Sequence, residues 1–267
     1  MRSIEELRGR FARLGRVMLG YSGGVDSSLL AVAARESLGR NDLLAVIGRS
    51  ASYPEAQYRQ ALALAGRFDV PLHELATGEL DDPRYLANAT DRCYFCKSEL
   101  WTRLSALADE LGFTAIVDGT NADDLQEHRP GLRAAAEWRI HSPLAELGWT
   151  KDDVRAAARE LGIPTWDAPA APCLSSRVQY GLGITPERLS QVERAEAYLR
   201  GIGVTGDLRV RHLGETARVE VSPREIPRVE RAWQGVVAFI RGLGFADVAL
   251  DPHGYRRGAL LVLGQDP

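Results

Sequence analysis

The chain has 267 residues, of which 45% are hydrophobic and 26% are charged, and its net charge at pH 7 is -3. These values are typical of a folded soluble protein with one large or two smaller domains, and they exclude a strongly basic nucleic-acid binder. The sequence has neither an apolar signal segment nor a stretch able to span a bilayer, so we expect a cytoplasmic protein without a membrane partner. Three cysteines in that compartment favour metal or redox chemistry over disulfides.

Short apolar runs alternate with helical patterns over the first two thirds of the chain. We expect strands over 17–21, 43–47, 72–75 and 114–117, and helices over 26–38, 54–67, 97–111 and 151–161. This alternation predicts an α/β fold, a doubly wound parallel sheet with helices on both faces. Ligands of such sheets bind beyond the carboxyl ends of the strands, where the loops at Ser22, Ile47 and Asp118 would converge.

The last third of the chain has a different pattern. A proline- and glycine-rich stretch between Pro164 and Gly183 is too long for a simple connection, and we interpret it as a functional loop. Thr185 and Pro186 then open a helix as its N-cap and first residue. The remainder predicts strands and one helix in a smaller α+β domain with an antiparallel sheet: strands 207–213, 216–222, 246–250 and 259–263, and helix 224–241. We therefore expect two domains, 1–180 and 181–267.

The strand over 17–21 runs directly into the heptapeptide SGGVDSS at 22–28. A tight turn followed by a helix start places backbone N–H groups and the hydroxyls of Ser27 and Ser28 around the positive end of a helix, which favours a phosphate or pyrophosphate. The adjacent Gly23 and Gly24 let the main chain approach an anion closely. Asp26 could hold a magnesium ion against the same phosphates.

This heptapeptide resembles the SGGxDS pyrophosphate loop of the ATP pyrophosphatases, which cleave ATP between its α- and β-phosphates. The resemblance implies ATP and Mg²⁺ as cofactors, with Ile47 and Arg49 at the adenosine. For Asn121 and Asp124, a nucleotide contact and a local role as an N-cap and a solvated side chain remain equal alternatives. The predicted nucleotide site contains Gly20, Ser22, Gly23, Gly24, Asp26, Ser27, Ser28, Ile47, Arg49, Gly119, Asn121 and Asp124.

The cysteines occupy two separate segments. Cys93 and Cys96 form a CxxC motif just before the helix expected near Lys97, and Cys173 lies between Pro172 and the sequence Ser-Ser-Arg. A CxxC motif can chelate a metal, form a redox pair or be purely structural, so by itself it does not decide the chemistry. Arg177 could stabilise a thiolate at Cys173 or bind an anionic substrate beside it.

Taken together, these segments resemble the LarE family of ATP-dependent sulfur transferases, which help to build the nickel-pincer nucleotide of lactate racemase. The segments that match, in order, are 22–28, 91–97, 118–124 with 129–131, 172–177 and 209–212. The resemblance implies that ATP adenylates a carboxylate of a pyridinium dicarboxylate mononucleotide, pyrophosphate leaves, and sulfur attack gives a thiocarboxylate. A homo-oligomer is plausible for the family.

The hairpin over 207–222 carries a charged face. Its period of two places Arg209, Arg211, Arg218 and Glu220 on one side, and a plain solvent face is the ordinary alternative for such a pattern. In the LarE family the matching arginines bind the phosphate of the mononucleotide. The resemblance therefore implies a substrate-phosphate site at Arg177, Arg209 and Arg211.

Two sources of sulfur remain open. In one branch of the family the cysteine that matches Cys173 gives up its own sulfur, whereas a second branch has three cysteines that resemble ligands of a [4Fe-4S] cluster. We favour the cluster, held by Cys93, Cys96 and Cys173, because three thiolates leave one iron open for a sulfide from a separate donor. A zinc site also remains possible.

Three other functions compete with sulfur transfer to a mononucleotide. A tRNA thiolase of the same superfamily is disfavoured by the net charge of -3 and by the lack of a basic stripe. An amide-forming synthetase related to NAD or GMP synthetases would not need the cysteines. A nucleotide sensor that does not turn over ATP is disfavoured by the complete SGGVDSS loop.

Overall fold

The computed structural model describes residues 2–126, 130–169 and 171–256. Its contacts divide the chain into two compact units, one made of Met1–Glu79 and Asp91–Ala171 and the other of Leu80–Thr90 and Pro172–Pro267. Segment 172–180, which the sequence placed in the first domain, is grouped with the second unit because Arg177 pairs with Glu196 and Arg211 donates to the Ser176 carbonyl. The expectation that 1–180 and 181–267 are separate domains stays a prediction.

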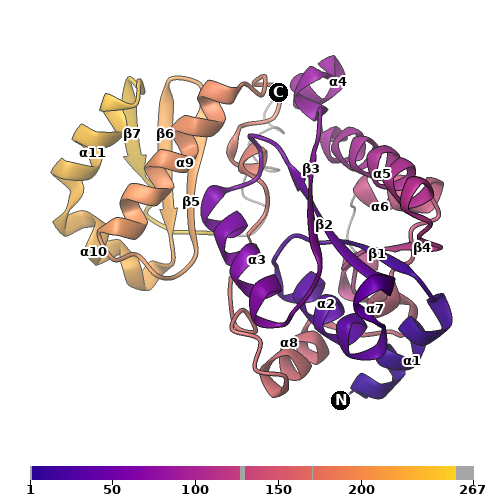
Figure 1. The fold of residues 1–267 in the computed structure, drawn as a ribbon. Helices are drawn as coiled ribbons and strands as arrows, with labels where there is room; N and C mark the ends of the chain where they lie inside the picture. The colour runs from indigo at the N-terminus through magenta and orange to yellow at the C-terminus, as the bar shows by residue number, and fades with distance from the viewer. Residues whose placement is uncertain (1, 127–129, 170, 257–267) are drawn as a thin grey trace. The chain divides into compact units, whose positions relative to one another are not determined.

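The first unit contains the predicted parallel sheet (Figure 1). Its strands lie in the order β3-β2-β1-β4, with bounds β1 Val17–Gly20, β2 Leu43–Arg49, β3 Leu72–Ala76 and β4 Ala115–Val117. Every pairing is parallel, so the carboxyl ends of all four strands share one edge. Because β1 is central, with β2 and β4 as neighbours, the loop after β1 lies between the loops that follow those strands.

Alternation of side chains along the strands separates two layers of helices. Val17 and Leu19 pack into one core, whereas Met18 packs with Trp101 in another. The helices on the first face are α1 Ile4–Leu14, α2 Val25–Ser37, α3 Glu55–Arg67, α7 Pro143–Glu146 and α8 Lys151–Glu160, and those on the second are α5 Arg92–Leu111 and α6 Pro130–Glu137. The predicted doubly wound α/β fold is therefore confirmed.

Helix α5 begins at Arg92, five residues before the predicted start, so the CxxC motif lies inside the helix rather than before it. Contacts with α6 stabilise this extra turn. The Tyr94 hydroxyl donates to Glu137 at 2.7 Å, and the guanidinium of Arg133 lies 3.8 Å from the centre of the Tyr94 ring. The helical start consequently depends on packing between helices and not on a capping side chain, since Asp91 makes no side-chain cap.

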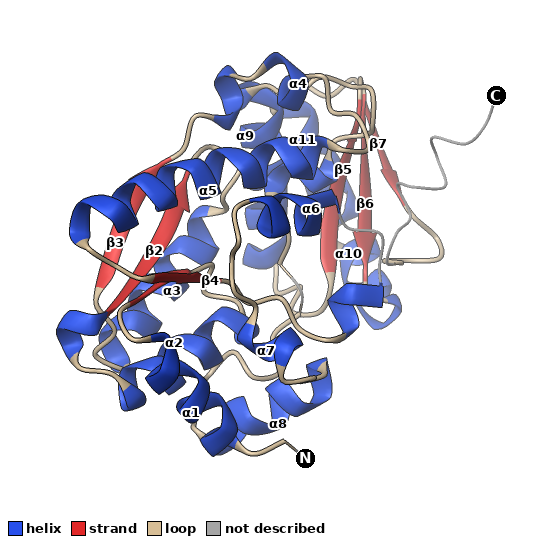
Figure 2. Cartoon of the chain, turned by 90° about the vertical axis from the view of Figure 1, so that its right-hand side faces the viewer, coloured by secondary structure: helices blue, strands red, loops and turns tan. Residues whose placement is uncertain are grey.

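The second unit is a smaller α+β arrangement (Figure 2). Strands β5 Leu208–Leu213 and β6 Thr216–Val221 form the predicted antiparallel pair, and β7 Asp247–Leu250 joins β6 in parallel. Helix α9 Pro186–Gly201 begins as predicted, with the Thr185 side chain accepting from the Arg188 N–H. The helix expected over 224–241 is divided at Ala232 into α10 Ile226–Arg231 and α11 Trp233–Gly242. The predicted strand over 259–263 lies outside the described residues.

Short elements complete the chain: α4 Pro83–Leu86 and the 3₁₀ turns η1 Arg40–Asp42, η2 Glu79–Asp81, η3 Asp123–Gln126, η4 Leu174–Arg177 and η5 Pro223–Glu225. In the second unit, Val210 and Val219 face a core formed with α9, α10 and α11. The opposite face of β5 and β6 carries the arginines of the hairpin. Over residues 2–126, 130–169 and 171–256, no helix has the length and apolar character needed to cross a membrane.

Candidate active site

The loop after β1 forms a tight turn that is held together by the Ser27 hydroxyl group. The Ser22 N–H donates to the Ser27 hydroxyl at 3.2 Å, and that hydroxyl donates to the Gly24 carbonyl at 3.2 Å. Gly23 has a φ of +67°, and a Cβ at this position would lie only 2.6 Å from the Cβ of Ala61. The turn therefore requires glycine at position 23 for both conformation and space.

Side chains from α3 and the loop before it hold the carbonyl oxygens of this turn. Tyr53 and Gln57 donate to the Ser22 carbonyl at 2.9 and 2.8 Å, and Gln60 donates to the Gly23 carbonyl at 3.4 Å. Helix α2 begins at Val25, and its N-cap Gly24 has no side chain to accept from the first N–H groups. These N–H groups and the positive end of the helix are features that suit an anion, and the binding of a phosphate here stays a prediction.

Asp26, in the first turn of α2, is held by two donors. The Asn121 amide donates to its Oδ1 at 3.0 Å, and the Lys151 ammonium forms an ion pair with its Oδ2. The Asp26 side chain remains 20% exposed. A partly exposed carboxylate is a ligand of the type that Mg²⁺ prefers, so the environment of Asp26 is compatible with its predicted role, which stays a prediction.

The loop after β4 approaches the turn closely. A Cβ on Gly119 would lie 3.1 Å from the Ser27 nitrogen, which explains the glycine. Asn121 is only 2% exposed, and its Oδ1 accepts the N–H groups of Asp123 and Asp124 at 3.0 and 3.2 Å. Asn121 thus caps the start of η3 with its oxygen, as one of the two alternatives has it, and holds Asp26 with its nitrogen. Its contact with a nucleotide stays a prediction. Asp124 closes the turn by accepting the Asn121 N–H at 3.1 Å.

Other predicted nucleotide residues contribute in different ways. Ile47 is 1% exposed and packs in the core, so only its backbone is available at the site. A Cβ on Gly20 would meet the Trp101 ring at 3.1 Å, so this glycine makes room for packing. Ser28 is also buried. The Arg49 guanidinium pairs with Glu55 at 2.7 Å and lies 3.7 Å from the centre of the Tyr58 ring; the bond to Glu55 raises the pKa of Arg49.

Two residues near this edge were not predicted from the sequence. Lys151 contacts Asp26 although the two are far apart in the chain, and its only local signal is a cation at a helix N-terminus, where cations are disfavoured. Glu79 is 2% exposed and accepts the hydroxyls of Ser50 and Ser52, the latter at 3.0 Å. It thereby joins the loops that follow β2 and β3.

Cys93 and Cys96 lie one helical turn apart at the start of α5, Cys93 exposed and Cys96 half-buried. The Arg92 guanidinium lies 3.9 Å from the Cys93 sulfur. Two neighbouring thiols suit iron or zinc. Among the described residues, however, no group of three or more His, Cys, Asp or Glu side chains is arranged to hold a metal ion. The predicted cluster therefore stays a prediction.

Cys173 belongs to the second unit, where it precedes η4. Arg177 fixes this segment: its Nη1 donates to the Pro172 and Cys173 carbonyls, and its Nε and Nη2 donate to Glu196 at 3.0 and 3.2 Å. The side chain of Arg177 is 4% exposed. In this arrangement Arg177 positions the backbone of Cys173, and its predicted contact with a substrate phosphate stays a prediction.

The charged face of the hairpin is buried, unlike the plain solvent face that the pattern alone would suggest. Arg209 lies opposite Glu220, and Arg211 lies opposite Arg218. Glu220 is fully buried between Arg211 and Arg218, each 2.9 Å away. Burial and, to a smaller extent, the nearby Arg177 lower the pKa of Arg209. An anion that reached these arginines would relieve their mutual repulsion.

His212, on the other side of β5, is not an anion ligand. Its Nε2 bonds to the Gln191 side chain at 3.0 Å, and its ring packs 4.7 Å from that of Phe245. Burial, together with the charge of Arg188, lowers the pKa of His212 to about 4. The imidazole is therefore neutral at physiological pH.

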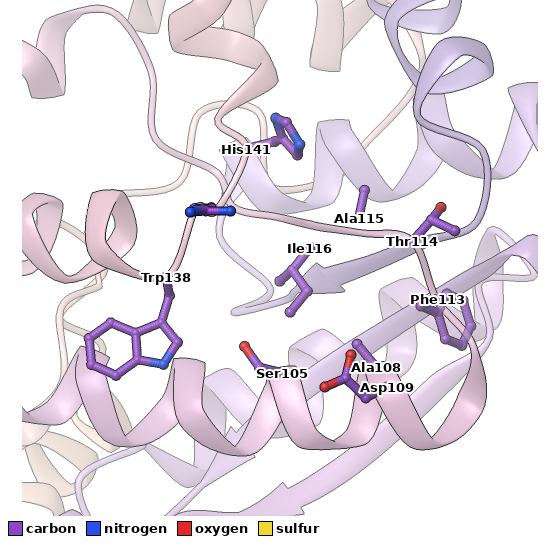
Figure 3. Close-up of a pocket in the computed structure, with 10 residues that line it drawn as sticks. Ser105, Ala108, Asp109, Phe113, Thr114, Ala115, Ile116, Trp138 and His141 are labelled. Atoms are coloured by element: carbon purple, nitrogen blue, oxygen red, sulfur yellow. The ribbon is translucent and has the colours of Figure 1, made fainter.

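A cavity of about 170 Å³ lies at the β4 edge of the first unit (Figure 3). Ser105 and Asp109 of α5 line it together with Ile116, Trp138 and His141. None of the residues predicted for the nucleotide or sulfur sites takes part in its lining. The cavity is therefore separate from the glycine turn.

Comparison with known proteins agrees with this geometry. The profile of the NAD synthase family matches residues 7–86, which contain the glycine turn and β2. An uncharacterized protein of Synechocystis is 44% identical over 96% of both chains, and one of Methanocaldococcus jannaschii is 29% identical over 90% of this chain and 91% of its own. The pyridinium-3,5-bisthiocarboxylic acid mononucleotide synthase of Lactiplantibacillus plantarum is 34% identical over 92% of this chain and 89% of its own. This chain belongs to the family of that synthase, the LarE family that its sequence motifs resemble.

Proposed function

We propose that this protein is an ATP-dependent sulfur transferase that converts a carboxylate of a pyridinium dicarboxylate mononucleotide into a thiocarboxylate, in the synthesis of a nickel-pincer cofactor. The product in the name of the Lactiplantibacillus plantarum relative supports this substrate. The observation that carries the proposal is the meeting of the glycine turn, Asp26, Asn121 and Lys151 at the carboxyl edge of the parallel sheet.

The glycine turn suits the activation of a carboxylate. A carboxylate oxygen of the substrate attacks the α-phosphorus of ATP, the bond to the bridging oxygen breaks, and pyrophosphate leaves with the electron pair. The resulting acyl-adenylate gives the carbonyl a good leaving group. The first N–H groups of α2, which no side chain caps, stabilise the charge that develops on pyrophosphate. Magnesium on Asp26 would add charge neutralisation of the phosphates.

The second step replaces oxygen by sulfur. A sulfur nucleophile attacks the activated carbonyl carbon, and AMP leaves with the electron pair of the broken carbon–oxygen bond. We propose that the substrate phosphate is held by the buried arginines of the second unit, Arg209 and Arg211, with Arg177 beside them. The repulsion between Arg177 and Arg209, which helps to lower the pKa of Arg209, supports an anion site there.

For the sulfur source we propose a [4Fe-4S] cluster with Cys93, Cys96 and Cys173 as ligands, which would supply a sulfide bound to its open iron. The alternative is that Cys173 gives up its own sulfur. Mass spectrometry of the protein before and after turnover separates them. A loss of the mass of hydrogen sulfide at Cys173 supports the alternative, whereas an unchanged chain with bound iron and sulfide, after anaerobic reconstitution, supports the cluster.

The proposed activity is tested by incubating the protein with ATP, Mg²⁺ and the dicarboxylate mononucleotide. We expect AMP and pyrophosphate to form only when the mononucleotide is present, and the mononucleotide to gain the mass difference between sulfur and oxygen. The match to the NAD synthase family makes an amide-forming synthetase the second candidate. That enzyme would form an amide from ammonia, and alanine at all three cysteines would leave its activity intact.

A further inference from the structure

A short segment from the N-terminal half of the chain, Leu80–Thr90, belongs to the second unit and not to the sheet that precedes it. This inserted segment lies between β3 and α5 in the sequence and contains α4. It contacts the loop that carries Cys173, because the hydroxyls of Tyr85 and Ser175 lie 2.6 Å apart although the two residues are 90 positions apart. The proposed reaction assigns no role to the inserted segment.

Asn88 fastens the inserted segment to the chain that follows η4. Its φ of +53° is the left-handed conformation, which asparagine adopts more readily than most residues, and the residue is fully buried. Its Nδ2 donates to the carbonyls of Gln179 and Leu182 at 2.8 and 2.9 Å, and its own carbonyl accepts the Gly181 N–H at 3.1 Å. Asparagine meets both demands of this position, a positive φ and a donor for two carbonyls, so the segment is fixed against 178–184.

Tyr85 connects the inserted segment to η4 itself. Tyr85 is 1% exposed and Ser175 is fully buried, so each hydroxyl needs a partner and the other supplies one. Ser175 lies two residues after Cys173, and its carbonyl accepts the Val178 N–H at 3.2 Å. The Tyr85 hydroxyl therefore holds η4 at a point close to Cys173.

The backbone of Cys173 is consequently held from two sides. Within its own loop, its carbonyl accepts the Ser176 N–H at 3.0 Å, the Ser176 hydroxyl at 2.8 Å and the Arg177 guanidinium at 2.9 Å. From the inserted segment, Tyr85 holds Ser175. The Cys173 side chain is only half-buried. A fixed backbone with an accessible side chain is the arrangement expected of a group that must be presented to a substrate in one orientation.

We propose that Tyr85 is a positioning residue for sulfur transfer, which orients Cys173 through Ser175 and takes no part in the activation of the carboxylate by ATP. This inference rests on the proposed function. It holds for both sulfur sources, because Cys173 is either the donor itself or a ligand of the cluster. Misplacement of reacting groups by about 1 Å can cost roughly 100-fold in rate, so one hydrogen bond at this loop is able to matter.

The test follows a single turnover of the anaerobically reconstituted protein with ATP, Mg²⁺ and the dicarboxylate mononucleotide, and measures pyrophosphate and thiocarboxylate separately. In Tyr85→Phe we expect pyrophosphate to appear at a rate within about twofold of that of the unmodified protein, and thiocarboxylate to form at least about tenfold more slowly. Without substrates, hydrogen exchange at the amides of Ser176 and Val178 should be roughly 2- to 10-fold faster in this variant, the worth of one buried hydrogen bond.

Three further variants serve as controls. Tyr198→Phe removes a hydroxyl from another tyrosine of the second unit, whose ring stacks on Phe239 at 4.2 Å, and should leave all three measurements unchanged. Ser175→Ala removes the other partner of the hydrogen bond and should reproduce the effects of Tyr85→Phe. The double variant of Tyr85 and Ser175 should be no slower than either single variant, because both remove the same interaction.

The possible contrary results have different meanings. If Tyr85→Phe forms thiocarboxylate at the normal rate, or slows pyrophosphate release to the same extent, Tyr85 does not position the sulfur step, although the proposed function still stands. If the effects of Tyr85→Phe and Ser175→Ala multiply in the double variant, Tyr85 does not act through Ser175. If the unmodified protein releases no pyrophosphate with the mononucleotide, the proposed function is wrong and the role of Tyr85 in it is wrong as well.

Discussion

Gly23 and Gly24 are neighbours in the turn after β1, yet we expect them to be required for different reasons. Gly23 has a φ of +67°, and an added Cβ would lie 2.6 Å from the Cβ of Ala61 in α3. Gly24 has a φ of -72°, and its Cβ would meet only the Ser22 hydroxyl, at 3.4 Å. Alanine at position 23 should therefore damage the fold, whereas alanine at position 24 should damage only the approach of a phosphate.

The structure sets the size of both effects. Alanine at a positive φ costs roughly 1–2 kcal/mol. The 2.6 Å contact is shorter than a normal carbon–carbon contact, so α3 or the turn must shift, at an overpacking cost of about 1–3 kcal/mol. The smaller entropy of the unfolded alanine chain offsets about 0.4–1 kcal/mol. We expect Gly23→Ala to lower the free energy of unfolding by about 2–4 kcal/mol and Gly24→Ala to change it by less than about 1 kcal/mol.

Urea unfolding and equilibrium ATP binding measure the two effects separately. Gly24→Ala should fold normally and lose at least about tenfold in ATP affinity, because its methyl group occupies space that a phosphate needs. In an Ala61→Gly background, only the backbone strain and the entropy offset remain, so Gly23→Ala should cost about 0–1.5 kcal/mol. Normal ATP binding by Gly24→Ala would refute the phosphate argument, and undiminished stability of Gly23→Ala would refute the packing argument.

Three further variants test other parts of the site. Asp26→Asn should lower pyrophosphate release at least about 100-fold, because the proposed magnesium ligand is lost. The free energy of unfolding in urea should change by less than about 1 kcal/mol, since the ion pair is partly exposed; an active variant would contradict the proposed role of Asp26. Arg177→Lys should cost about 2–3 kcal/mol in urea unfolding, because an ammonium cannot hold Glu196 and the loop carbonyls together; a loss under about 0.5 kcal/mol would argue against this fixation. His212 has its pKa lowered to about 4 in the folded protein, so the unfolded chain takes up the proton first as pH falls below 6.5. The protein should therefore lose roughly 1–2 kcal/mol of stability between about pH 7 and pH 5, and His212→Gln should remove this loss. Glu225, whose pKa is lowered to about 2, stabilises the folded protein above its ordinary pKa of 4.5. That stabilisation is lost only below about pH 4.5, outside the window assigned to His212.

The parts of the fold that could be predicted from sequence are those with a local signal. Val17, Met18 and Leu19 form a continuous apolar run because β1 is buried by a core on each face, and this run identified β1 without any knowledge of its neighbours. The turn at 22–28 was predictable because its seven residues are contiguous. Helix α1 carried comparable signals, since Ser3 caps its first turn and Leu7 and Phe11 are buried, but it was not predicted.

The remaining features depend on contacts between distant segments. Helix α5 starts at Arg92 because Tyr94 packs on α6, and no capping side chain marks that start. Lys151 and Asp26 are 125 residues apart in the chain, and no pattern near either residue in the sequence indicates their ion pair. The burial of the charged hairpin face likewise depends on segment 172–178, whose Ser176 carbonyl accepts from Arg211 at 3.0 Å.

The two units offer different groups to the two anions of the proposed reaction, pyrophosphate and the substrate phosphate. The difference agrees with the fate of each anion in that reaction. At the glycine turn, the groups proposed to bind pyrophosphate are backbone N–H groups that no side chain caps. Pyrophosphate must leave this site in every turnover, so exchangeable contacts favour its release. In the second unit, Arg177 and Arg211 are each held by a carboxylate and a backbone carbonyl, so their positions are fixed before a ligand arrives. A phosphate that stays attached to the substrate gains from this preorganisation, because it only has to keep the reacting carboxylate oriented.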